Sequence, residues 1–197
     1  QFNNASEGEV VSGGTLTFNE TRRFSNAGKM QGETVSLNTR KADNSGQILG
    51  LSALSLSGTE SLTNSGNLLS KGKLSLTSGQ LDNQGQIAAP GLSVNSQQIT
   101  NSGLLQGDQL FDFTAASLHN QKPGSIISGS GLRLAIPDLV NAGLISVTQG
   151  LAIEAATLDN AGNIEAKDLQ LTLGQQLNNQ AKGVLLADDM LHLSTPV

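Results

Sequence analysis

Apolar and polar positions along the chain repeat in a unit of about nineteen residues. Each unit contains an apolar residue, then an Asn two positions later, then a Gly, then another apolar residue two positions after the Gly. The first apolar position is Phe2 in the first unit and Leu177 in the tenth, which is 175 residues in nine steps, or about nineteen per step. A fixed period of this length is typical of repeat architectures in which each unit contacts only its neighbours.

The Asn and Gly positions are present in all ten units. The asparagines are Asn4, Asn26, Asn44, Asn64, Asn83, Asn101, Asn120, Asn141, Asn160 and Asn179. The glycines are Gly8, Gly28, Gly46, Gly66, Gly85, Gly103, Gly124, Gly143, Gly162 and Gly183.

Each unit closes with two apolar residues separated by one residue, as in Leu54-Ser55-Leu56 and Leu169-Gln170-Leu171. Alternation with a period of two predicts short strands, and Asn or Gly at fixed offsets predicts the corners between them. We therefore expect two or three strands of three to five residues in each unit. No segment maintains the three- and four-residue spacing of an amphipathic helix, so the chain is predicted to be all-β.

One unit cannot fold alone. It offers four or five core side chains, worth roughly 1.5–3 kcal/mol each when buried, whereas ordering about nineteen residues costs about 1.5 kcal/mol per residue. Stacking the units lets each one pair its strands with those above and below and share one core. The sequence thus predicts a single domain, residues 1–197, forming a right-handed parallel β-helix of about ten coils and roughly 48 Å in length.

The recurring Asn and Gly are predicted to form the corner of the coil. We expect the ten asparagines to stack as a structural ladder, each amide bonding the backbone and the equivalent amides in adjacent coils. We expect the Gly to occupy a position of positive φ, which a Cβ atom would penalise.

Composition and charge narrow the functional classes. Eleven Lys and Arg against sixteen Asp and Glu give a net charge of −5, without a basic cluster beyond Arg22 and Arg23, so a nucleic-acid partner is disfavoured. No apolar run approaches the roughly 20 residues of a membrane-spanning helix. The chain has no cysteine, which excludes disulfides and thiolate metal sites.

The unit resembles the repeats of the filamentous haemagglutinin family, the exoproteins of bacterial two-partner secretion, which include contact-dependent growth inhibition proteins. The runs that carry the resemblance are Leu62-Thr63-Asn64-Ser65-Gly66-Asn67-Leu68 and Leu158-Asp159-Asn160-Ala161-Gly162-Asn163-Ile164. The resemblance implies an extracellular protein at the bacterial cell surface, exported through an outer-membrane secretion transporter, of which this chain is an interior fragment. It also implies that binding or toxic regions lie elsewhere in the parent protein.

The outward side chains offer few candidates for chemistry. The outward position of the closing pair is occupied by Thr17, Ser36, Ser55, Ser75, Ser93, Asp112, Arg133, Ala152, Gln170 and His192. The four consecutive serines predict a solvated hydroxyl row. Asp43, Asp82 and Asp159 share the slot before Asn but lie at least two coils apart, too far for one metal ion, and the adjacent Asp188 and Asp189 should point to opposite faces.

No catalytic residue, cofactor or metal site is predicted. The two histidines, His119 and His192, are expected on the outside and about four coils apart, too far to share a site, and no coil has room for the long loop that builds an active site on a solenoid. Extra residues separate Asn from Gly in coils one, seven and ten, and the Gly129–Gly131 run is expected to be a corner. If a partner docks, the irregular region 108–124 is the predicted place, through Asp112, His119 and Lys122.

These observations favour a rigid, monomeric stalk segment of a secreted bacterial adhesin or growth-inhibition exoprotein. The alternative is a face of the same exoprotein that recognises a target-cell receptor or glycan. A polysaccharide-cleaving β-helix enzyme is a third class, and it is disfavoured by the absence of a long loop.

Overall fold

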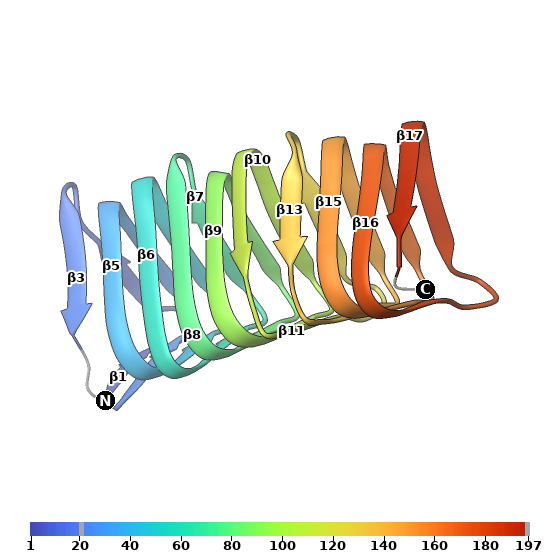
Figure 1. The fold of residues 1–197 in the computed structure, drawn as a ribbon. Coiled ribbons are helices and arrows are strands. Elements are labelled where there is room, and N and C mark those ends of the chain that lie inside the picture. Colours follow the sequence, from blue (N-terminus) through green and yellow to red (C-terminus); the bar gives the residue numbers. More distant parts are fainter. Residues whose placement is uncertain (20–21, 196–197) are drawn as a thin grey trace.

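The computed structural model describes residues 1–19 and 22–195 as a solenoid of stacked coils (Figure 1), with the two ends of the chain at opposite ends of the stack. The described residues form no helix, and thus none long and apolar enough to cross a membrane. Within these described ranges, seventeen strands form one continuous sheet. Their bounds are β1 (Phe2–Asn4), β2 (Glu9–Val11), β3 (Thr15–Asn19), β4 (Arg23–Asn26), β5 (Lys29–Asn44), β6 (Gln47–Asn64), β7 (Asn67–Ser70), β8 (Lys73–Asn83), β9 (Gln86–Asn101), β10 (Leu104–Thr114), β11 (Ser117–Asn120), β12 (Ser125–Ser128), β13 (Leu132–Ala135), β14 (Asp138–Asn141), β15 (Leu144–Asn160), β16 (Asn163–Asn179) and β17 (Val184–Ser194).

Every strand pairs in parallel with the equivalent segment of the next coil. In β6, β8 and β9, for example, Leu54 is opposite Leu74, and Leu74 is opposite Leu92. The asparagines follow the same register, with Asn64 opposite Asn83 and Asn83 opposite Asn101. The predicted all-β solenoid of about ten coils is confirmed, as is the alignment of the repeat units.

The predicted strand length was wrong for most coils. β5, β6, β9, β15 and β16 each contain sixteen to eighteen residues and continue around the corners. Because neighbouring coils share one register, the backbone groups at a corner also find partners in the next coil, so pairing does not stop where the chain turns. Short strands of four residues occur where the coil is irregular, as in β12, β13 and β14. Gly129 and Ser130 form the bend between β12 and β13, as expected for a corner.

The core is a set of stacked apolar columns in the interior of the coils. Leu54, Leu74 and Leu92 belong to one column and are at most 1% exposed. Phe111 and Phe113 are buried from the same strand, β10, with ring centroids 5.7 Å apart, while Asp112 between them is exposed. The buried apolar side chains form one cluster along the solenoid, so each coil depends on its neighbours for burial.

Candidate functional site

The ten asparagines form an uninterrupted column of hydrogen bonds along one corner of the coils. In each of nine consecutive steps, from Asn4 to Asn179, the Nδ2 of one Asn donates to the Oδ1 of the Asn in the next coil, over 2.8–2.9 Å. Nine of the ten, from Asn4 to Asn160, are buried, with exposed fractions between 0% and 6%. Asn179, the last of the column, is exposed to solvent. The side-chain amide therefore serves as a second ladder beside the backbone one.

Each amide from Asn4 to Asn141 also bonds the backbone of two coils. Asn83 Nδ2 donates to the carbonyl oxygen of Gly85 over 3.2 Å and to that of Leu104, in the next coil, over 3.1 Å. No buried side-chain nitrogen or oxygen in the described part of the chain lacks a partner. Because an unpaired buried polar group is costly, a column of this kind is stable only when every amide is satisfied.

The glycine of the corner is required for a reason other than the predicted one. No glycine among residues 1–19 and 22–195 has a positive φ, so the expectation of a left-handed backbone was wrong. A Cβ atom on Gly85 would instead overlap the carbonyl oxygen of Gly66, and one on Gly66 would overlap that of Gly46. The coils approach so closely at this corner that a side chain has no room.

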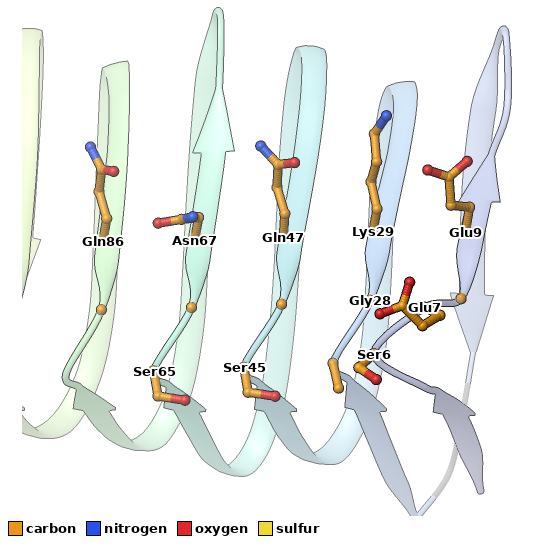
Figure 2. A pocket seen from close by; sticks show the side chains of 15 residues that line it. Ser6, Glu7, Glu9, Gly28, Lys29, Ser45, Gln47, Ser65, Asn67 and Gln86 are labelled. Atoms are coloured by element: carbon orange, nitrogen blue, oxygen red, sulfur yellow. The ribbon is translucent and has the colours of Figure 1, made fainter.

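The outer side of the corner is a polar hollow of about 710 Å³ that crosses the first five coils. Figure 2 shows Lys29, Gln47, Asn67 and Gln86 in a row along one wall, one from each of coils two to five, with Ser45 and Ser65 at the corner itself. The floor is backbone, because glycine occupies that position in every coil.

Three coils carry two extra residues at this corner, and all three fold them in the same way. The extra residues form a turn in which the Gly N–H bonds the carbonyl oxygen three residues earlier: Gly8 to Ala5, Gly124 to Gln121 and Gly183 to Gln180. In the other coils the chain passes from Asn to Gly through one residue. The turns of coils one, seven and ten therefore project from an otherwise uniform edge.

The three candidate contact residues lie on different parts of the coil. Asp112 is opposite Ser93 on the face formed by the closing pairs, whereas His119 is opposite Thr100 on the face that precedes the Asn–Gly corner. Lys122 lies in the inserted turn of coil seven. All three are exposed. The structure therefore does not bring the three residues together, and only Lys122 lies at the Asn–Gly corner.

The outward carboxylates make local contacts. Asp43 pairs with Arg23 over 2.9 Å, and Asp159 accepts hydrogen bonds from Asn178 and Gln180. No group of three His, Cys, Asp or Glu side chains that could hold a metal ion occurs within the described ranges. The four serines of the closing pairs are adjacent in the register, from Ser36 to Ser93, and they form the expected row.

Lys182 lies in the inserted turn of coil ten and was not among the residues predicted from the sequence to contact a partner. Lys182 and Lys122 line one hollow of about 470 Å³ at the Asn–Gly corner. The spacing of the repeat indicates both inserted turns, because Asn and Gly are four residues apart in coils seven and ten and two apart in the coils between.

Comparison with known proteins agrees with this architecture. The family model described as haemagglutinin repeat matches the chain twice, over residues 3–106 and 86–189. The chain belongs to the haemagglutinin repeat family. The resemblance inferred from the Asn and Gly pattern is therefore confirmed, and no solved structure matches the chain.

Curated relatives with these haemagglutinin repeats are long proteins. The tRNA nuclease CdiA of Yersinia mollaretii is 30% identical over 95% of this chain and 8% of its own length. The tRNA nuclease CdiA of Escherichia coli strain NC101 is 35% identical over 85% of this chain and 5% of its own length. A toxin CdiA of Escherichia coli is 35% identical over 94% of this chain and 6% of its own length. The chain thus spans less than a tenth of the relatives it matches.

Charged side chains of successive haemagglutinin repeats pair across coils. Arg133 Nη2 lies 2.6 Å from Glu154 Oε2, and Lys167 Nζ lies 3.6 Å from Asp189 Oδ2. Glu60 accepts hydrogen bonds from Arg40, and these bonds are the largest cause of a lowered pKa at Glu60. Desolvation of the Glu60 carboxylate opposes this shift, whereas the positive charges of Arg40 and Lys41 add to it. The side chains of all these pairs are exposed to solvent, so each pair adds little to the stability of the fold.

Proposed function

We propose that this chain is a rigid spacer within a secreted bacterial exoprotein of the contact-dependent growth inhibition or adhesin type. The observation that supports this function is continuity: strand pairing and the Asn column both run through all ten coils without a break. A segment built in this way holds what lies at its two ends at a fixed separation.

Stiffness follows from the way the coils share their contacts. Bending the rod would open one side of the stack, which requires stretching of backbone hydrogen bonds and of the buried amide column at the same time. Each coil also buries its apolar side chains against the next coil. The energy of a bend is therefore spread over several contacts at every interface between coils, so thermal motion bends the rod little.

The wider context is proposed from the relatives. The CdiA proteins are named for toxin or nuclease activity, and this chain matches only a small part of their length. We infer that the chain has no catalytic role, that it forms an interior segment of its parent, and that it acts outside the cell at the bacterial surface. Export of such a parent requires an outer-membrane secretion transporter as its partner.

The spacer function is tested by removing one coil from the parent exoprotein. Deletion of residues 65–83 joins Asn64 to Gln84, which preserves the register because Asn64 and Asn83 are equivalent. A spacer should become shorter by one coil, about 5 Å, and keep its target specificity. The readouts are the length of the displayed fibre by electron microscopy and the range of target cells that are recognised.

Loss of target recognition after this deletion, with display at the surface intact, would contradict the spacer role and favour a binding face. The matched control removes one coil from the other side of the irregular region, residues 142–160, which joins Asn141 to Ala161. Two spacer coils should give the same result wherever they are removed.

A receptor- or glycan-binding face is the second candidate function. It is favoured by one observation, the projection of three inserted turns from the same corner of the coils. A uniform rod does not need such turns.

A further inference from the structure

The inserted turns of coils one, seven and ten are not explained by the spacer role. The coils without them stack equally well, since the Asn column and the backbone pairing pass through both kinds of coil. In repeat proteins, insertions gather on one face, and that face is often the one that binds a partner. A binding site on this surface is therefore expected at the Asn–Gly corner.

Two of the turns form the end walls of a hollow. Lys122 of coil seven and Lys182 of coil ten line the same hollow of about 470 Å³, and coils eight and nine form its floor between them. The floor consists of Ala142 with Gly143 and Ala161 with Gly162. A ligand lying there could approach the backbone closely, because no side chain longer than a methyl group rises from these four positions.

The charge of this hollow is unbalanced. Lys122 and Lys182 form no ion pair with any residue in the described ranges, and no acidic side chain lines the hollow. Asp159, the acid that precedes the column asparagine of coil nine, accepts hydrogen bonds from Asn178 and Gln180. Two uncompensated positive charges at the ends of an uncharged floor suit a ligand that carries one negative charge at each end.

The first hollow at the same corner has no excess of positive charge. Glu9 and Lys29 are register partners in neighbouring coils, and Glu7 of the first inserted turn lies on the same hollow (Figure 2). Its two carboxylates outnumber its one lysine, so the net charge of its lining is negative. Its remaining wall is formed by neutral amides such as Gln47 and Gln86, so it offers no comparable attraction to an anion.

The spacing of the two lysines defines the ligand. Three coil steps of roughly 4.8 Å separate coils seven and ten, or roughly 14 Å in total. An extended peptide advances about 3.4 Å per residue, so acidic residues at positions i and i+4 are about 13–14 Å apart and point to the same side of the strand. The long lysine side chains can adjust for the small difference.

We propose that the hollow between Lys122 and Lys182 binds an extended acidic peptide, with carboxylates at positions i and i+4 held by the two lysines. The site goes beyond the spacer function, and its failure would leave that function unaffected. Binding is expected to be weak and to decrease with salt, because both ion pairs are exposed to solvent.

The test measures binding of fluorescein-labelled peptides to the full 197-residue chain by fluorescence anisotropy at low salt. One pentapeptide carries glutamate at its first and fifth positions with threonine and alanine between. Its isomer, of the same composition and charge, carries glutamate at the first and third positions, about 7 Å apart. The first peptide should bind about fivefold more tightly than the isomer.

Lys122→Ala and Lys182→Ala should each abolish that preference, whereas Lys71→Ala should preserve it. Lys71 is an exposed lysine on a different hollow, so it reports the general effect of removing one positive charge. Equal binding of the two peptides, or a preference that survives both substitutions, would overturn the proposal. Binding of polygalacturonate that depends on both lysines, in the absence of peptide binding, would also overturn it and assign the hollow to an acidic polysaccharide.

Discussion

At the scale of the residue, the buried asparagine is the most constrained position of the repeat. Asn83 is fully buried. Its side chain accepts a hydrogen bond from Asn64 and donates to Asn101 and to the backbone carbonyls of Gly85 and Leu104. A smaller side chain cannot satisfy both neighbouring amides. The position therefore tolerates only a residue that donates and accepts at once within the same volume.

We expect Asn83→Ala to lower the free energy of unfolding by about 2–4 kcal/mol, because it leaves the Oδ1 of Asn101 buried without its donor. Urea-induced unfolding followed by circular dichroism measures the change. Asn95→Ala is the control: Asn95 is exposed, and its substitution should change stability by less than about 0.5 kcal/mol. Equal effects of the two substitutions would show that the column contributes no special stability.

The corner glycine gives a second residue-scale prediction. Gly85→Ala should destabilise the fold by at least about 2 kcal/mol, because the new Cβ would overlap the carbonyl oxygen of Gly66 and force two coils apart. Gly150→Ala should be neutral or slightly stabilising, by up to about 1 kcal/mol, because a Cβ there meets no atom within 4 Å. Thermal unfolding of both variants measures the change in stability. A Gly85→Ala variant as stable as the original chain would contradict the steric role of this glycine.

The sequence predicted which residues occupy the corner but not why glycine is needed there. The Asn and Gly positions could be aligned because their spacing recurs in every unit. The steric conflict, in contrast, joins residues about nineteen positions apart in the chain and exists only after the coils stack. A rule based on local backbone conformation therefore gave the wrong reason for the right residue.

At the scale of the element, charged residues connect adjacent strands on the outside of the coils. Arg40 of β5 bonds Glu60 of β6, and this interaction lowers the pKa of Glu60. Because the folded-state pKa lies below the unfolded one, the pair stabilises the fold above the unfolded pKa of Glu60. That stability is lost as the pH falls through the folded-state pKa.

Arg40→Gln should raise the pKa of Glu60 towards the ordinary range of a glutamate, since it removes the largest cause of the shift. A carboxyl-detected NMR titration measures this pKa. Lys73→Gln, which removes an exposed positive charge from β8, should leave the titration of Glu60 unchanged. An unchanged pKa in Arg40→Gln would contradict the assigned cause.

Strand identity and register could be predicted from the sequence, whereas strand length could not. Alternation located inward residues such as Leu54 and Leu56 correctly. Gly and polar residues at the corners were interpreted as strand ends, although β6 passes through them as one element of eighteen residues. Pairing in a stacked coil depends on the neighbouring coil, and a pattern within one unit contains no information about it.

The inserted turns show the same limit for the candidate site. Their extra residues were visible in the spacing of coils one, seven and ten. That Lys122 and Lys182 line one hollow depends on how many coils separate them along the axis and on which corner they share. Asp112 and His119 are near Lys122 in the sequence, but the coil places them on other faces.

At the scale of the whole molecule, the coil is the unit that can be added or removed. Deletion of residues 65–83 from the 197-residue chain should leave a folded solenoid whose maximum dimension in small-angle X-ray scattering is about 5 Å smaller. Ile87 would then stack on Ile48, in the position that Leu68 now occupies.

Deletion of ten residues, 65–74, should instead unfold the chain around the junction, because it removes half a coil and moves inward side chains out of register. Circular dichroism compares the strand content of the two deletions. If both deletions retained full strand content, the register between coils would not be what determines the fold.

The column of asparagine amides also has a direction. Each Nδ2 from Asn4 to Asn160 donates to the following coil, and each Oδ1 from Asn26 to Asn179 accepts from the preceding one. Dipoles aligned head to tail polarise one another, so amides in the middle of the row are held more firmly than those near its ends. The solenoid is in this sense an electrically polar filament, with carbonyl oxygens facing one terminus and amide hydrogens facing the other, and the two termini present different chemistry to whatever adjoins them.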